Sequence, residues 1–175
     1  MILKRILVLV AAFMLIAVPA MARLHSDQDI GIEGVGLGSE MSYVEGVYGK
    51  PTTLHDIPAK AGVIRPYSMA RADYKGHFSI WYIYADRRNG VIRVETEYEG
   101  MATPAGVTVG MDASAVGNIY GRADYVQLVG GQTIFSYVFG NQIMNFAVKA
   151  GTIRKISIEY DPEFMVGQIV GAATK

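Results

Sequence analysis

Two stretches of the chain, 72 residues apart, follow nearly the same pattern. The first is VGLGSEMSYVEGVYGKP at residues 35–51, and the second is VTVGMDASAVGNIYGRA at residues 107–123. A sequence pattern that recurs after a fixed interval indicates a duplicated structural unit. The aligned pairs are Gly34/Gly106, Val35/Val107, Gly38/Gly110, Val44/Val116, Val47/Ile119, Tyr48/Tyr120 and Gly49/Gly121.

Each copy is predicted to contain one short helix. Its shared apolar positions fall at i, i+3 and i+4, the spacing that places side chains on one face of a helix. Val44 and Val47 in the first copy, and Val116 and Ile119 in the second, are therefore expected in a core beneath the two helices.

The ends of both helices can also be located. Asp112 is a plausible N-cap for the second helix, and Ser39 or Glu40 for the first, because their side-chain oxygens accept orphan backbone N–H groups. Gly49 and Gly121 fall where helices commonly end in a left-handed residue.

Downstream of each helix the apolar period changes from 3.6 to 2, which predicts strands. The closing segments match again at an offset of 62, because the first copy has a longer connection at Thr52–Pro66. This connection is expected to be a loop outside the core, where function concentrates. The predicted strands are 67–74, 77–84 and 91–99 in the first copy, and 125–128, 133–139, 143–149 and 153–160 in the second.

The resulting fold class is α+β, with two tandem repeats that each pack a short helical segment on one face of an antiparallel β-meander. The other face of each sheet is expected to stay open. The predicted organisation is a signal peptide at 1–22, a polar leader at 23–33, repeats at 34–100 and 101–160, and a C-terminal extension at 161–175.

The N-terminus predicts export. Lys4 and Arg5 precede an apolar run that ends in a small-x-small site at Ala22, the pattern of a cleaved signal peptide, and the run is shorter than the roughly 20 residues of a membrane span. Localisation is therefore expected to be periplasmic or extracellular, with membrane contact only through the signal segment before cleavage.

Composition excludes several classes. The part after the signal keeps 14 of the 16 basic residues and all 16 acidic ones, a formal charge of −2, so nothing favours nucleic acid. The chain has no cysteine, which excludes disulfides, thiolate metal sites and a lipidated N-terminal Cys.

A search for catalytic or metal-binding residues yields no assigned site and no cofactor. His25 with Asp27 and Asp29 could ligate a metal, but terminal segments are usually mobile. His55 has no Ser partner identifiable by spacing, and no nucleophile motif such as Gly-x-Ser-x-Gly occurs. The acidic row Glu95, Glu97 and Glu99 is interpreted as a solvated strand face, with a cation or a basic partner as the alternative.

Aromatic residues are the more informative group. They concentrate in the first sheet, and the open face is expected to carry Trp81 and Ile83 or their even-numbered neighbours; the sequence does not fix the register. Core packing is the default interpretation, whereas exposed rings would form a rigid contact surface. The candidate partner-binding residues are Trp81, Tyr82, Tyr84, Tyr74, Arg71, Arg87 and Arg88.

The repeated pattern Val-x-x-Val/Ile-Tyr-Gly-Lys/Arg, with its closing strand ending Glu-Tyr, resembles the tandem-repeat domain of the β-lactamase inhibitory protein family. It is also similar to the single unit of the small outer-membrane assembly lipoprotein family. The resemblance implies an α+β unit used twice and a role in binding another protein. Relatives in the two families carry disulfides or a lipidated Cys, which this chain lacks, and no inhibitory residue is carried over.

Three functions are consistent with the sequence. The first is an exported, non-catalytic module that binds another exported or envelope protein through its sheet surface. The alternative is a carrier of a small apolar or envelope-derived ligand, which requires an enclosed cavity between helices and sheet. A hydrolase comes third and requires a His within hydrogen-bond reach of a nucleophile, or a paired-carboxylate cleft.

Overall fold

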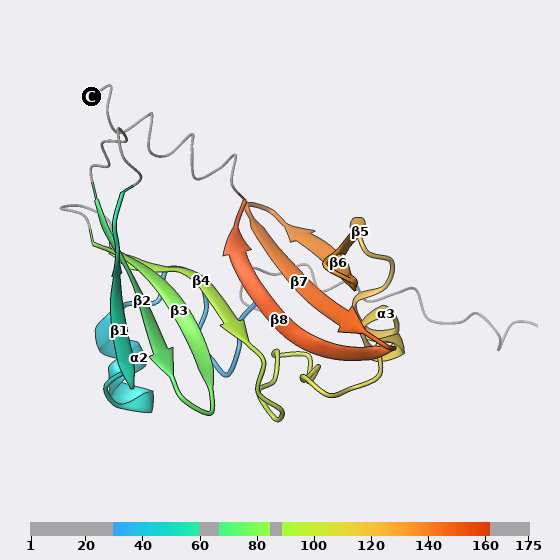
Figure 1. Ribbon diagram of the computed structural model, residues 1–175, viewed down its shortest axis with the longest axis horizontal. Helices are drawn as coiled ribbons and strands as arrows, with labels where there is room; N and C mark the ends of the chain where they lie inside the picture. Colours follow the sequence, from blue (N-terminus) through green and yellow to red (C-terminus); the bar gives the residue numbers. More distant parts are fainter. Residues whose placement is uncertain (1–29, 60–66, 85–88, 162–175) are drawn as a thin grey trace, which may run out of the picture.

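The computed structural model describes residues 30–59, 67–84 and 89–161. All of the described strands join one antiparallel sheet of eight strands, in the order β1-β2-β3-β4-β8-β7-β6-β5, and two short helices lie on one side of it (Figure 1). The protein is therefore mostly β. The elements are α2 (Met41–Tyr48), β1 (Thr53–Ile57), β2 (Ser68–Tyr74), β3 (Phe78–Tyr84), β4 (Gly90–Thr96), α3 (Ser114–Tyr120), β5 (Tyr125–Val129), β6 (Gln132–Phe139), β7 (Gln142–Lys149) and β8 (Thr152–Tyr160).

The two meanders share one sheet, whereas the sequence suggested a sheet for each helix. They meet where β4 pairs with β8, through Arg93↔Glu159, Val94↔Ile158 and Thr96↔Ile156. These are the two closing segments that match each other in sequence. An unpaired closing strand would expose a row of backbone donors and acceptors, and the β4–β8 pairing removes one such edge from each meander.

The core fills the space between the helices and one face of the sheet. Val44 of α2 and Val116 of α3 are 0% and 1% exposed, as their helical spacing predicts. Val47 does not follow the prediction, because it is 56% exposed, and Ile119 is only partly buried. An eight-residue helix that lies on a sheet buries a narrow stripe, and the ring of Tyr48 closes the α2 stripe with its centroid 4.8 Å from that of Phe78.

The connection at 52–66 is not entirely a loop, because it contains β1. All of β1 except Ile57 is exposed. Because neither face of the strand is buried, its sequence does not alternate between apolar and polar residues. Its backbone pairs with β2 from Thr53↔Asp73 to Ile57↔Met69. Residues 60–66 lie outside the described part of the chain.

The segment before α2 is folded against β4. Ile30 and Ile32 at the end of the predicted polar leader are 5% and 0% exposed. Gly38 donates a backbone hydrogen bond to the Val91 carbonyl at 2.7 Å. A Cβ on Gly90 would meet the backbone of Gly38 at 3.1 Å, so glycine is needed for this close approach.

The remaining predicted strands and both helices are confirmed within a few residues at their ends. Neither described helix is long and apolar enough to cross a membrane. The predicted signal peptide, residues 1–22, lies outside the described residues, as does most of the predicted C-terminal extension.

Candidate functional site

The face of the sheet opposite the helices is here called the open face. Strand pairing places Arg71, Trp81, Arg93 and Glu159 in one row across it, since residues paired between antiparallel strands point to the same side. No described helix lies over this face (Figure 1). The sequence could not choose between Trp81 and its even-numbered neighbours, and the structure places Trp81 and Ile83 on the open face.

Trp81 lies between two guanidinium groups at the centre of the β1–β4 half. The Cζ atoms of Arg71 and Arg93 are 5.0 and 4.8 Å from its ring centroid, one from each neighbouring strand. The register of β3 against β4 shifts between Trp81 and Tyr82, which makes Ile92 an additional residue beside this cluster. Bulges of this kind bend a strand and redirect its side chains. The result is an aromatic ring that receives one cation–π contact from each neighbouring strand.

Arg93 continues the cluster into the second half of the sheet. Its Nη2 donates to Glu95 Oε2 at 2.8 Å and its Nη1 to Glu159 Oε2 at 3.2 Å. Asn145 Nδ2 in turn donates to Glu159 Oε1 at 3.2 Å, and Ser136 Oγ donates to Asn145 Oδ1 at 2.6 Å. A polar network thus crosses β4, β8, β7 and β6 without interruption.

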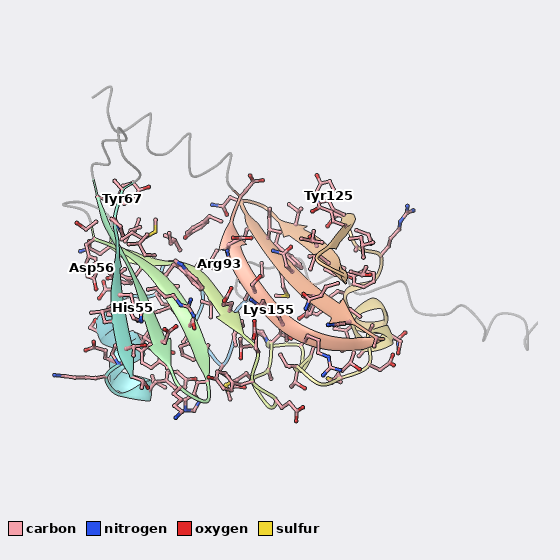
Figure 2. The ribbon with its side chains drawn as sticks, in the orientation of Figure 1. His55, Asp56, Tyr67, Arg93, Tyr125 and Lys155 are labelled. Atoms are coloured by element: carbon pink, nitrogen blue, oxygen red, sulfur yellow. The ribbon has the colours of Figure 1, made fainter. Side chains whose placement is uncertain are left out.

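Lys155 on β8 neutralises part of the predicted acidic row. Its Nζ is 2.8 Å from Glu97 Oε1 and 3.5 Å from Glu95 Oε1. Burial lowers the pKa of Lys155, but the hydrogen bond to Glu97 and the two carboxylate charges outweigh this and raise it above its usual value. Figure 2 shows Arg93 and Lys155 where the two halves of the sheet meet. Two members of the acidic row are therefore ion-paired on a sheet face.

A second polar cluster surrounds Asp73 on β2. Arg71 Nε donates to Asp73 Oδ1 at 2.7 Å, Ser79 Oγ donates to the same oxygen at 2.6 Å, and Thr53 Oγ1 donates to Oδ2 at 3.1 Å. Burial raises the pKa of Asp73, yet these hydrogen bonds together with the Arg71 charge outweigh it and hold the pKa below its usual value. The carboxylate is the anchor that fixes Arg71 beside Trp81.

This cluster brings a Ser, a His and an Asp together, but in the wrong order for nucleophilic catalysis. His55 Nε2 lies 3.9 Å from Asp73 Oδ2, and Ser79 donates to the other carboxylate oxygen. A catalytic triad needs the imidazole between the hydroxyl and the carboxylate, so that it can take the hydroxyl proton. Here the carboxylate stands between them, and the arrangement does not activate Ser79.

The predicted partner-binding residues divide between the two faces. Trp81 and Arg71 meet on the open face, whereas Tyr74 and Tyr82 are 3% and 5% exposed in the core. Tyr84 lies on the helix side of the sheet at the end of β3 and is 40% exposed. Burial of Tyr74 and Tyr82 removes them from any contact surface. Arg87 and Arg88 lie outside the described residues.

Sequence reasoning missed Arg93, Lys155, Glu159 and Asn145. These side chains become neighbours only through the β4–β8 and β7–β8 pairings, which join residues up to 66 positions apart. The matching ends of the two closing segments, Thr-Glu-Tyr and Ile-Glu-Tyr, were the available signal, because like strands of a duplicated unit can pair.

The described residues include no group of three or more His, Asp or Glu side chains suited to a metal ion. A surface cleft of about 480 Å³ lies between α3 and the strands β5 and β6, and its lining includes Val116, Val126, Phe135 and Tyr137. Tyr137 donates through its hydroxyl to the Gly121 carbonyl at 3.0 Å, which fixes one wall.

No family model matches the chain, and no curated protein matches it. Among solved structures, the fold is similar to an extracellular protein containing a SCP domain from Bacillus anthracis str. Ames, with a TM-score of 0.52 and 9% sequence identity over 86% of this chain and 52% of that chain. The protein thus spans about half the length of that relative, and the likeness concerns the fold alone. A DUF4309 family protein (YjgB) from Bacillus subtilis subsp. subtilis str. 168 is similar with a TM-score of 0.43 and 13% identity, over 73% of this chain and 83% of that chain.

Proposed function

We propose that the protein is an exported, non-catalytic protein-binding module whose partner lies on the open face of the sheet. The observation that carries the proposal is Trp81, the single Trp of the chain, held between Arg71 and Arg93 on a face that no described helix covers. Trp and Arg are the residue types that most often dominate binding energy at protein interfaces.

The cluster is ordered before any partner arrives. Arg71 is tied to Asp73 and Ser79, and Arg93 is tied to Glu95 and Glu159. Side chains already held in one arrangement lose less conformational entropy on binding, which favours affinity. The guanidinium groups of Arg71 and Arg93 lie 5.0 and 4.8 Å from the centroid of the Trp81 ring, so a partner that reaches the ring also contacts these two side chains.

Charge on the open face is balanced within the face itself. Each of Arg71, Arg93 and Lys155 has at least one carboxylate within 3.2 Å. Paired charges of this kind give specificity through complementary polar contacts more than through long-range attraction. A partner with a mixed polar and apolar surface fits this pattern better than a polyanion does.

The ligand-carrier alternative requires space in the layer between helices and sheet. Val44, Val116 and Phe146 in that layer are at most 1% exposed and pack within one continuous core cluster. The space that does lie between a helix and the sheet is the cleft between α3, β5 and β6, and it opens at the surface, whereas a carrier needs an enclosed cavity. These observations support the interaction module over a carrier.

We also propose that the binding face arose from a duplicated α/β unit, as in the families that the sequence resembles. Three aligned glycine pairs share a positive φ: Gly34 and Gly106 at 79° and 82°, Gly49 and Gly121 at 76° and 77°, and Gly38 and Gly110 at 83° and 94°. Matched backbone conformations at matched positions support a common origin for the two segments.

Site-specific photo-crosslinking tests the location of the interface. A photoreactive amino acid at Ile143, next to Glu159 on the open face, is expected to give one crosslinked adduct of defined size in the exporting cell. The matched control places it at Tyr43 on α2, which is 50% exposed on the other side of the molecule. Adducts from Tyr43 with none from Ile143 would contradict the proposal.

A further inference from the structure

The two edges of the sheet differ in how they are protected. At one edge, β1 carries His55 and Asp56 and is followed by Pro58, features that discourage pairing with another chain. At the other edge, β5 has the sequence YVQLV without charge or proline, and all five residues are exposed. An uncharged apolar edge strand is a template for another strand.

We infer that β5 pairs with β5 of a second copy of this chain, in antiparallel orientation about a two-fold axis perpendicular to the sheet. The two sheets would then continue into one another, with the helices of both copies on the same side. This pairing is independent of the open face and of the partner proposed for it.

The sequence of β5 is self-complementary in this arrangement. A two-fold axis at Gln127 pairs all five residues of each strand, with Tyr125 opposite Val129 and Val126 opposite Leu128. Every apolar side chain then faces an apolar one, and the single polar residue faces its own copy. Two residues that face each other across the axis point to the same side of the sheet only when the axis passes through a residue. An axis through any residue other than Gln127 would leave part of β5 unpaired.

In this arrangement, the most exposed side chain of β5 would reach the cleft of the other copy. Leu128 is 78% exposed and points to the helix side, as Val126 does. Opposite Val126, Leu128 of the second copy would lie at the mouth of the cleft lined by Val126, Phe135 and Val116. Symmetry repeats the contact, so each copy supplies one leucine and one cleft.

The contact is small for a dimer. Tyr125, Val126 and Val129 are 57–59% exposed, so pairing the two strands and filling both clefts would bury on the order of 1,000 Å² in total. Standard stable interfaces bury about 1,200–2,000 Å². The predicted dimer is therefore reversible and depends on protein concentration.

Residue 127 offers a sharp test, because it faces itself across the axis. In sedimentation equilibrium, the exported protein is expected to show a reversible monomer–dimer transition. Gln127→Lys and Gln127→Glu are each expected to weaken the association by up to about fivefold through like charges at the axis. An equimolar mixture of the two variants is expected to restore association as a heterodimer.

Leu54→Lys is the matched control, because Leu54 is an exposed residue of β1, the edge strand at the other end of the sheet. It is expected to associate like the wild type, since β1 takes no part in the β5–β5 pairing. Circular dichroism of each variant verifies the fold, which an exposed edge position should not disturb. A monomeric wild type at all concentrations would overturn the inference, and so would Lys and Glu variants that associate as the wild type does or fail to restore association when mixed.

Discussion

Replacing Arg93 with Met tests whether the polar network of the open face stabilises the fold. Met has a long, unbranched side chain like the aliphatic stem of Arg. It lacks the guanidinium, which lies 4.8 Å from the Trp81 ring and bonds to Glu95 and Glu159. Arg93 is the only link, within the described residues, between the Trp81 cluster and the network of β8 and β7.

The expected cost follows from the exposure of the partners. The side chain of Arg93 is 36% exposed and that of Glu95 is 13% exposed. The energy of this ion pair therefore lies between two limits. An exposed ion pair contributes about 0.2–1 kcal/mol, and a buried hydrogen bond to a charged group contributes about 1.5–3 kcal/mol. Lys155 lies 3.5 Å from Glu95 and still neutralises part of the Glu95 charge after Arg93 is removed. Adding a cation–π contact of about 0.5–1 kcal/mol, we expect a loss of about 2 kcal/mol in the free energy of unfolding.

Urea unfolding followed by circular dichroism measures this loss. Arg154→Met is the matched control, because Arg154 is an exposed Arg on β8, and its cost is expected to stay within about 0.5 kcal/mol. The double-mutant cycle with Glu159→Gln isolates the Arg93–Glu159 coupling. An Arg93→Met cost no larger than that of the control would refute the reasoning.

Three further predictions concern the core and the response to pH. Phe146→Ala removes a fully buried ring 5.3 Å from that of Tyr120 and is expected to cost about 3–5 kcal/mol in urea unfolding; a cost below about 1 kcal/mol would mean that the core is packed differently. Burial raises the pKa of Tyr74 from 10.0 to about 12, so its contribution to stability is complete below pH 10 and is lost as the pH rises from 10 to 12. Tyr74→Phe is expected to reduce this loss of stability at alkaline pH. If stability falls between pH 10 and 12 as steeply in the variant as in the wild type, the prediction is wrong. The pKa of Asp73 is held below 3.8, so its contribution is present above pH 3.8 and is lost as the pH falls further; Asp73→Asn is expected to reduce the acid dependence of stability, and equal acid sensitivity of both proteins would contradict this.

The sequence predicted the helices and most strands because their local patterns are strong. Val44 and Val116 follow the helical period and are buried. Val47 fits the same period but is exposed, because the periodicity does not reveal how wide a stripe the sheet covers. β1 escaped detection because no face of it is buried, and edge strands of this kind lack the alternation on which prediction depends.

The candidate site was harder to predict than the fold. In β3 both faces carry large apolar residues, Tyr82 on one and Trp81 on the other, so alternation alone does not assign the open side. Arg93 and Glu159 are brought together by a strand pairing that spans 66 residues and has no local signal. The position of Trp81 in the sequence could be singled out, but the two arginines that hold it required the sheet register.

The most direct test of a binding role for the open face is the capture of a partner by the purified, immobilised protein from an extract of the cells that produce it. Trp81→Ala removes the centre of the cluster, and Val47→Ala removes an exposed apolar side chain from α2 on the opposite side. We expect one protein to be retained by the wild type and by Val47→Ala and to be lost with Trp81→Ala. Equal retention by all three, or loss with Val47→Ala alone, would contradict the assignment of the binding surface.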